Sequence, residues 1–239
     1  MQDLNNKVAL ITGGSKGIGL GIAEAMVREG MKVAVTSRSQ AAADEAAKHL
    51  NKIQANSAIG IEADVVNYQA QEASVNKTLE TFGQLDILIA NAGVGHFAPI
   101  ESLELDQWKQ TIDINLTGVF YSVKAAIPAI KKSQGYIITI ASLAGTNFFA
   151  KGAAYNASKF GLVGFTQAIM MDLRQYGIKV TTIMPGSVST YFNGRTPTDA
   201  EAWKIQPEDL GQITTDLLKM HPRTLPSKVE VRPSMPPQK

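Results

Sequence analysis

The residues best suited to chemistry in this sequence are a tyrosine and a lysine four positions apart, Tyr155 and Lys159. The composition after Gly152 favours a helix, and residues four apart on a helix lie on one face. A free tyrosine has a pKa of about 10 and is a poor proton donor at neutral pH. A neighbouring ammonium group stabilises the phenolate and brings that pKa toward working pH. The pair could therefore perform acid–base catalysis, although the same spacing also fits an ordinary surface helix.

A glycine-rich turn near the amino terminus favours the catalytic interpretation of this pair over an ordinary surface helix. Residues 8–12 are apolar and β-branched, as expected for a strand buried on both faces, and residues 20–29 favour a helix. Between them, Gly13, Gly17 and Gly19 are spaced Gly-x-x-x-Gly-x-Gly. A glycine turn between a strand and a helix amino terminus can cradle phosphate, because the backbone approaches the anion and helix N–H groups point at it. A nucleotide site is therefore favoured over a bare tight turn.

Composition sets limits on the class of protein. The chain has 239 residues, of which 44% are hydrophobic, so one α/β domain with a large core is expected. A net charge of +2 gives no argument for nucleic acid. There is no cysteine, and His49, His96 and His221 are too far apart for a metal site. Residues 1–7 are polar and no apolar run approaches a membrane span of about 20 residues. We expect a cytoplasmic protein without metal or membrane contact.

Strand and helix patterns alternate along the whole chain, which predicts a parallel, doubly wound sheet of about seven strands with helices on both faces. The predicted strands are 8–12, 32–36, 58–62, 85–90, 135–141, 178–184 and 228–232. The predicted helices are 20–29, 40–53, 67–82, 106–132, 153–176 and 206–220. Pro128 is expected to end or kink the fourth of these helices.

Several short motifs follow the predicted strands in order, and with them the sequence resembles the short-chain dehydrogenase/reductase family over nearly its whole length. The motifs are Thr12-Gly13-x-x-x-Gly17-Ile18-Gly19, Asp64-Val65, Asn91-Ala92-Gly93, Asn115, Ser142, Tyr155-x-x-x-Lys159 and Pro185-Gly186. The resemblance implies one Rossmann domain over residues 1–239, binding a nicotinamide cofactor and acting on a carbonyl or alcohol.

The resemblance also implies a catalytic set of four residues. Tyr155 would donate the proton to a carbonyl oxygen that Ser142 holds by a hydrogen bond. Lys159 would lower the pKa of Tyr155 and bind the nicotinamide ribose. Asn115 would hold a water that joins Lys159 to solvent. Nearby Ser158 is expected to be structural.

The cofactor is expected to be NADP(H). An acidic residue after the second strand would repel the 2′-phosphate of NADP, but this chain has Ser37 there, followed by Arg38, which offers a charged partner. Lys16 adds a second positive charge. The implied cofactor-binding set is Gly13, Ser15, Lys16, Gly17, Ile18, Gly19, Ser37, Arg38, Asp64, Val65, Asn91, Ala92, Gly93, Tyr155, Lys159, Pro185, Gly186, Val188 and Thr190.

The substrate pocket is expected to form from the loops 95–97, 143–149 and 187–203, with residues 188–205 as a mobile lid. Their aromatic residues favour a fairly apolar small-molecule ketone or aldehyde. These residues are Phe148, Phe149, Tyr191, Phe192 and Trp203. His96 could donate a hydrogen bond in this pocket, but without a partner it is expected to be incidental.

The expected function is that of an NADP-dependent carbonyl reductase or alcohol dehydrogenase. A 3-oxoacyl-[acyl-carrier-protein] reductase is the alternative enzyme, and it would need a basic surface, for which Lys131, Lys132 and Arg174 are candidates. A non-catalytic NADP-sensing protein is a third possibility, which the intact Ser, Tyr and Lys argue against. A homodimer through the Asn115 and Tyr155 helices is expected, while the proline-rich tail at 233–237 leaves a homotetramer open.

Overall fold

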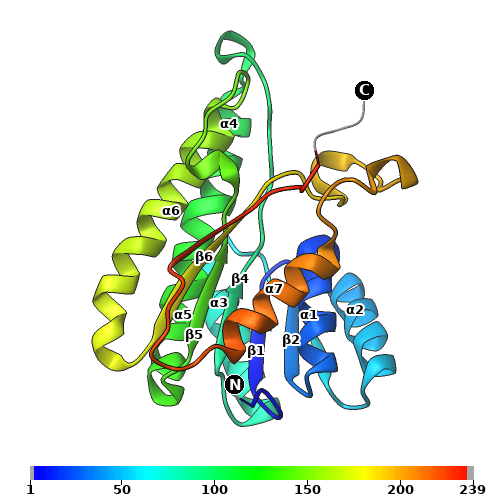
Figure 1. Cartoon of the computed structure of the whole chain (residues 1–239), viewed down its shortest axis with the longest axis vertical. Coiled ribbons are helices and arrows are strands. Elements are labelled where there is room, and N and C mark those ends of the chain that lie inside the picture. Colours follow the sequence, from blue (N-terminus) through cyan, green and yellow to red (C-terminus); the bar gives the residue numbers. More distant parts are fainter. Residues whose placement is uncertain (1–2, 236–239) are drawn as a thin grey trace.

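The computed structural model of the chain describes residues 3–235, so positions 236 and 237 of the proline-rich tail lie outside the described residues. A parallel sheet in the order β3-β2-β1-β4-β5-β6-β7 crosses the molecule (Figure 1). Its strands are β1 Val8–Ile11, β2 Lys32–Ser37, β3 Ala58–Glu62, β4 Ile87–Ala90, β5 Tyr136–Ile140, β6 Lys179–Pro185 and β7 Lys228–Val231. The predicted single-domain, doubly wound fold is confirmed. Its strand order reverses between β1 and β4, where such sheets open a ligand crevice at their carboxyl ends.

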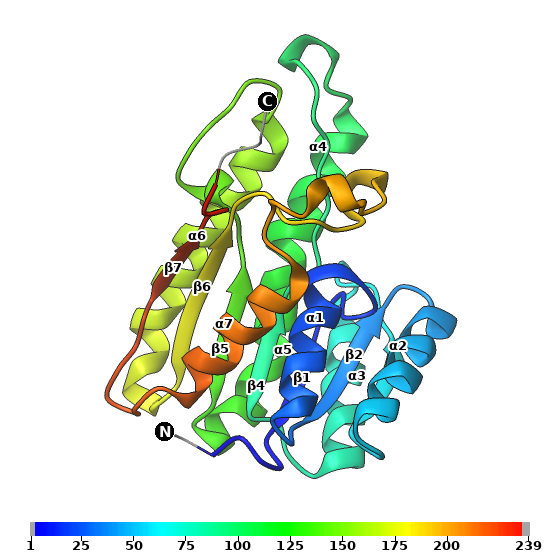
Figure 2. The same ribbon diagram turned by 45° about the vertical axis from the view of Figure 1, so that its right-hand side comes forward.

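Helices cover both faces of the sheet and bury two separate apolar layers (Figure 2). The helices are α1 Gly17–Arg28, α2 Gln40–Ile53, α3 Tyr68–Phe82, α4 Leu105–Ile112, α5 Gly118–Ser133, α6 Ala153–Leu173 and α7 Pro207–Lys219. One layer joins α1, α2 and α7 to the sheet, and the other joins α3, α5 and α6 to it. Within β1, Ile11 points into the first layer and Leu10 into the second, because successive strand residues face opposite sides. This two-sided burial explains the unbroken apolar strands in the sequence.

The helical stretch predicted over 106–132 is present at 105–133, but it contains an irregularity that was not predicted. The chain forms α4, then one wide π-helical turn at Asp113–Thr117, then α5. An apolar pattern near the 3.6-residue period does not reveal one extra residue in a turn, so this wide turn could not be predicted from the sequence. Pro128 does not end α5, which continues to Ser133 with Val123 and Ile130 buried against the sheet. That packing outweighs the lost backbone hydrogen bond.

Two helix ends also differ from expectation. α1 begins at Gly17 and not at residue 20, so the last residues of the glycine turn form its first turn. α6 ends at Leu173, and residues up to Tyr176 form a tighter 3-10 turn. Among residues 3–235, no helix is both long and apolar enough to cross a membrane.

Candidate active site

The glycine turn shapes an anion cradle at the carboxyl end of β1. Gly13 has φ +62° and Gly17 φ +57°, which is the left-handed region that glycine adopts without strain. A Cβ on Gly19 would lie 2.6 Å from the Gly13 carbonyl oxygen. Lys16 precedes α1 without capping it through its side chain, so N–H groups at the start of the helix remain available to a ligand. These residues fit a dinucleotide diphosphate.

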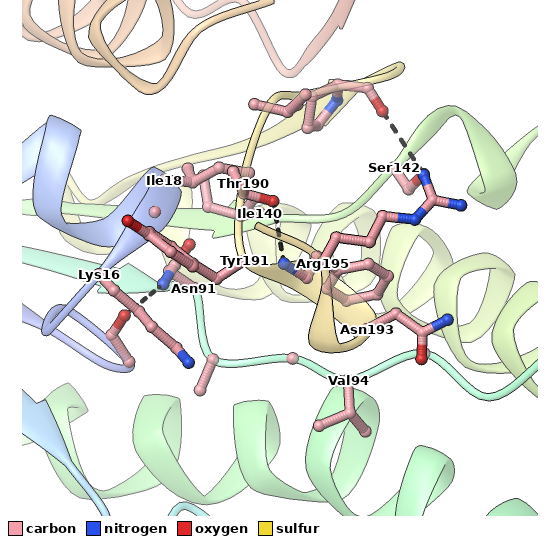
Figure 3. Close-up of a pocket in the computed structure, with 18 of the residues that line it drawn as sticks. Lys16, Ile18, Asn91, Val94, Ile140, Ser142, Thr190, Tyr191, Asn193 and Arg195 are labelled. Carbon is pink, nitrogen blue, oxygen red and sulfur yellow. Dashed lines mark hydrogen bonds between the residues drawn. The ribbon is translucent and has the colours of Figure 1, made fainter. Parts of the chain in front are cut away.

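Asn91 ties the ends of β1 and β4 together. Its Nδ2 donates to the carbonyl oxygens of Thr12 (2.9 Å) and Gly13 (3.0 Å). The Thr12 hydroxyl in turn accepts from the backbone N–H groups of Asn91 (3.0 Å) and Ala92 (3.2 Å). The predicted Asn91-Ala92-Gly93 turn is therefore held beside the glycine cradle, at the point where the strand order reverses. Figure 3 shows Asn91 close to Lys16 of the cradle.

Ser142, Tyr155 and Lys159 meet at the carboxyl ends of β5 and β6. Ser142 lies two residues after the end of β5, and its Oγ donates to the Pro185 carbonyl oxygen (3.4 Å). Lys159, one helical turn after Tyr155 in α6, places its Nζ 5.7 Å from the centroid of the Tyr155 ring. The same Nζ donates to the Ile140 carbonyl oxygen (3.0 Å). The structure thus brings together the three polar groups that the sequence placed on two elements.

Burial governs the protonation of this cluster. Lys159 is 4% exposed, and desolvation lowers the pKa of its ammonium group to about 8. Burial raises the pKa of the Tyr155 phenol, while a hydrogen bond with Ser142 acts in the opposite direction. The lowering of the Tyr155 pKa by Lys159 stays a prediction.

Asn115 is fully buried in the π-helical turn, and its side chain forms hydrogen bonds with Val94, which lies in a loop 21 residues earlier in the sequence. Its Oδ1 accepts from the Val94 N–H (2.8 Å), and its Nδ2 donates to the Val94 carbonyl oxygen (2.9 Å) and to Ser158 Oγ (3.0 Å). A Cβ built on Gly93 would lie 3.3 Å from Asn115 Oδ1 and 3.7 Å from Lys159 Nζ, so the two side chains approach the same point. The water between them stays a prediction. Ser158 has a structural role, because its hydroxyl anchors Asn115 to α6.

One cavity of about 2510 Å³ joins the predicted residues. Ser142 and every residue of the implied cofactor set except Gly19 line it, while Gly19 and Asn115 lie behind its wall. Ser37, Arg38 and Asp64 are at one end, beyond the cradle, where the sequence predicted the adenosine half of a cofactor. Lys16 points toward the 188–205 segment instead, with Nζ 5.8 Å from the centroid of the Tyr191 ring.

Aromatic side chains surround Tyr155 at the other end of the cavity. The Phe97 ring lies 5.3 Å from the Tyr155 ring and 5.8 Å from the Phe149 ring, centroid to centroid. Phe192 lies 5.8 Å from Tyr155. The expectation that His96 lacks a partner is wrong, because its Nε2 lies 2.6 Å from Gln110 Oε1, a contact across fourteen residues that no local pattern indicates.

The role of Asn156, the residue after Tyr155, was not predicted from the sequence. Its Nδ2 donates to the carbonyl oxygens of Ala144 and Asn147 (both 2.8 Å), and its Oδ1 accepts from the Phe149 N–H (3.4 Å). Asn156 therefore holds the loop after Ser142 against the helix that carries Tyr155. The only local feature in the sequence is the position of Asn156 directly after Tyr155.

The two ends of the segment 188–205 are hydrogen-bonded to each other. Val188 pairs with Ile205, the Ser189 N–H donates to the Ile205 carbonyl oxygen (2.9 Å), and the Ile205 N–H donates to Ser187 (3.1 Å). Residues between these ends line the cavity, and Figure 3 shows Tyr191, Asn193 and Arg195 across from Val94. Movement of the segment as a lid stays a prediction.

Residues 7–201 match the family model described as short chain dehydrogenase. A trans-4-hydroxycyclohexanecarboxylate dehydrogenase of Sinomonas cyclohexanicum is 40% identical over 192 residues, which cover 77% of this chain and 73% of that protein. A solved alcohol dehydrogenase of the archaeon Thermococcus sibiricus, complexed with 5-hydroxy-NADP, is 27% identical with a TM-score of 0.92, covering 98% of this chain and 100% of that one. A 3-ketoacyl-(acyl-carrier-protein) reductase of Brucella melitensis, complexed with NADH, is 27% identical with a TM-score of 0.87, covering 97% and 98%.

Proposed function

The chain belongs to the short-chain dehydrogenase family of oxidoreductases, and we propose that it is an NADP-dependent enzyme that interconverts a ketone or aldehyde and the corresponding alcohol. The observation that carries the proposal is the meeting of Ser142, Tyr155 and Lys159 in the cavity that also contains the glycine cradle. A cofactor site next to a buried proton donor is what carbonyl reduction requires, whereas a sensor needs only the first of these.

Each polar group has a role set by its position. A bound nicotinamide would supply or accept the hydride. Tyr155 gives its phenolic proton to the carbonyl oxygen during reduction, and Ser142 holds that oxygen by a hydrogen bond. With a pKa of about 8, most Lys159 side chains are charged at neutral pH, and this charge favours the phenolate. Asn115 fixes the Val94 loop and approaches Lys159, where a water could pass the proton to solvent.

The preference for NADP rests on the end of β2. Ser37 removes the acidic side chain that would repel a 2′-phosphate, and Arg38 lines the same end of the cavity. The two similar solved structures carry one NADP derivative and one NADH, so the choice depends on these local residues. Lys16 would reach the phosphate after turning away from Tyr191.

The aromatic rings around Tyr155 support an apolar substrate near the carbonyl. The Sinomonas relative is named for a cyclic secondary alcohol, which supports the same class here. A 3-oxoacyl reductase is the second candidate, favoured by the likeness to the Brucella structure. That function would need basic residues to hold the acidic carrier. One of the candidates, Lys131, already contacts Tyr176, with its Nζ 3.5 Å from the ring centroid.

We also propose that residues 188–205 act as a lid and that the protein is a homodimer or homotetramer. α5 and α6 carry Phe120 (45% exposed) and Phe160 (42% exposed) on their outer faces, and a symmetric partner would cover them.

The proposed function is tested by a panel of cyclic ketones, aldehydes and a 3-oxoacyl thioester, assayed by loss of NADPH or NADH absorbance. Faster turnover of a ketone or aldehyde with NADPH supports the proposal. Activity confined to the thioester would support the second candidate, and nicotinamide binding without turnover of any member would support a sensor.

A further inference from the structure

Arg195 is a positive charge at the substrate end of the cavity, and we propose that it binds a carboxylate of the substrate, so that the enzyme acts on an oxo acid or the corresponding hydroxy acid. This inference deepens the proposed function and rests on it. The carbonyl would lie at Ser142 and Tyr155, and the acid group would lie at Arg195, with an apolar spacer between them.

A tight turn directs Arg195. Asn193 (φ 58°, ψ 38°) and Gly194 (φ 72°) are both left-handed, and the Arg195 N–H donates to the Phe192 carbonyl oxygen at 3.4 Å. Two left-handed central residues of the type Asn-Gly make a type I′ turn. Such a turn brings its first and fourth residues close together, here Phe192 and Arg195. Arg195 therefore leaves the turn next to Phe192.

Phe192 shows which side that is. Its ring lies 5.8 Å from the Tyr155 ring, and its tip would be 2.6 Å from a Cβ built on Gly95, so it packs over the reaction centre. The start of the same segment faces the cofactor cradle, because Thr190 lies beside Gly17. Figure 3 shows Tyr191 extending toward Lys16 and the Arg195 side chain extending away from Lys16. Arg195 is thus placed for the substrate and not for the cofactor diphosphate.

The other charged side chains at this end of the cavity already have partners. Glu201 forms an ion pair with Lys204, and the pKa of Glu201 is lowered mainly by that hydrogen bond, with Arg195 the smallest of its causes. Arg232 pairs with Glu230 at 3.1 Å. Within residues 3–235, Arg195 has no ion-pair partner. An arginine without a carboxylate partner in a cavity is suited to a charged oxygen pair of a ligand.

The aromatic walls define the spacer. Phe97 and Phe192 pack edge to face, with ring centroids 6.4 Å apart, and both lie beside Tyr155. A ligand that joins Tyr155 to Arg195 would lie along these rings, so this part of the substrate should be apolar. A ring or short chain of methylene groups meets that condition. A matched pair of probes is 4-oxocyclohexanecarboxylate and its neutral amide, 4-oxocyclohexanecarboxamide, which differ in charge and little in shape.

The decisive quantity is the ratio of kcat/KM for the carboxylate to kcat/KM for the amide. We expect a ratio of about ten or more in the wild type, since a partly exposed charged hydrogen bond contributes about one such factor. Arg195→Gln should bring the ratio near one, and Arg195→Lys should restore part of it. Arg232→Gln is the matched control and should keep the wild-type ratio. A ratio that survives in Arg195→Gln overturns the proposal, as does a loss confined to NADPH affinity.

A binding measurement separates this inference from the proposed function. Calorimetric titration of the NADPH-loaded protein compares cyclohexanecarboxylate with cyclohexanecarboxamide, neither of which can be reduced as a ketone. Tighter binding of the carboxylate by the wild type, lost in Arg195→Gln, supports the carboxylate site even if no ketone is turned over. Equal binding of the two ligands by the wild type overturns the site, whatever the turnover shows.

Discussion

Replacing Lys159 with methionine should stabilise the protein while removing its activity. Methionine keeps the length of the side chain and loses the charge, which here is desolvated in the interior. The ordinary pKa of 10.5 falls to about 8 in the folded protein. At about 1.4 kcal/mol per pH unit, the buried charge costs the folded state about 3 kcal/mol. Loss of the hydrogen bond to Ile140 offsets about 1 kcal/mol of the gain.

The pH dependence of the stability difference between wild type and variant shows whether desolvation of the Lys159 charge is its cause. Below pH 8 the lysine is charged in both states, so the full cost is present and the methionine variant has its full advantage. Between about 8 and 10.5 the unfolded state holds the proton and the folded state does not, so the stability of the wild type rises with pH. Above 10.5 this difference between wild type and variant disappears.

Urea unfolding at pH 7 and pH 9 measures both effects. We expect Lys159→Met to be more stable than the wild type by about 2 kcal/mol at pH 7 and by less at pH 9. Lys48→Met, at an exposed position of α2, is the control and should change stability by less than about 0.5 kcal/mol. A Lys159→Met variant that is less stable than the wild type at pH 7 would refute the desolvation argument.

Three further predictions concern the cofactor, the substrate loop and assembly. The wild type should prefer NADPH to NADH by about ten- to a thousandfold in kcat/KM, and Ser37→Asp with Arg38→Ala should reverse much of this preference; equal efficiency of the wild type with both cofactors would exclude the assigned role of Arg38. Asn156→Ala should raise the KM for ketone about tenfold with unchanged NADPH affinity, because the loop after Ser142 loses three hydrogen bonds; an unchanged KM would dismiss the loop anchor. Light scattering at micromolar concentration should show a dimer or larger species, and a monomer would count against assembly through α5 and α6.

The parts of the site that depend on local sequence could be predicted. The glycine cradle follows β1 directly, and Tyr155 and Lys159 are one turn apart, so spacing alone places their atoms. Contacts between distant segments could not be read in this way. Asn115 meets Val94 across 21 residues, and the wide turn that holds Asn115 leaves the apolar pattern almost unchanged.

The residues proposed to contact the substrate also include some features that could be predicted from the sequence and some that could not. Its aromatic content was evident from composition, but the direction of Arg195 depends on the left-handed turn at Asn193 and Gly194 and on where Phe192 packs. Asn-Gly is a recognisable turn sequence, yet only the folded chain shows which wall of the cavity the turn faces.

Tyr155 is the proposed proton donor, and Tyr155→Phe tests this role most directly because only the hydroxyl is removed. NADPH binding should be measured by fluorescence, and ketone reduction should be measured on the same preparation by loss of NADPH absorbance. General acid catalysis contributes about 10²–10⁴-fold, so turnover should fall at least about a hundredfold while NADPH affinity stays nearly intact. A variant that keeps more than about a tenth of wild-type turnover would contradict the assignment.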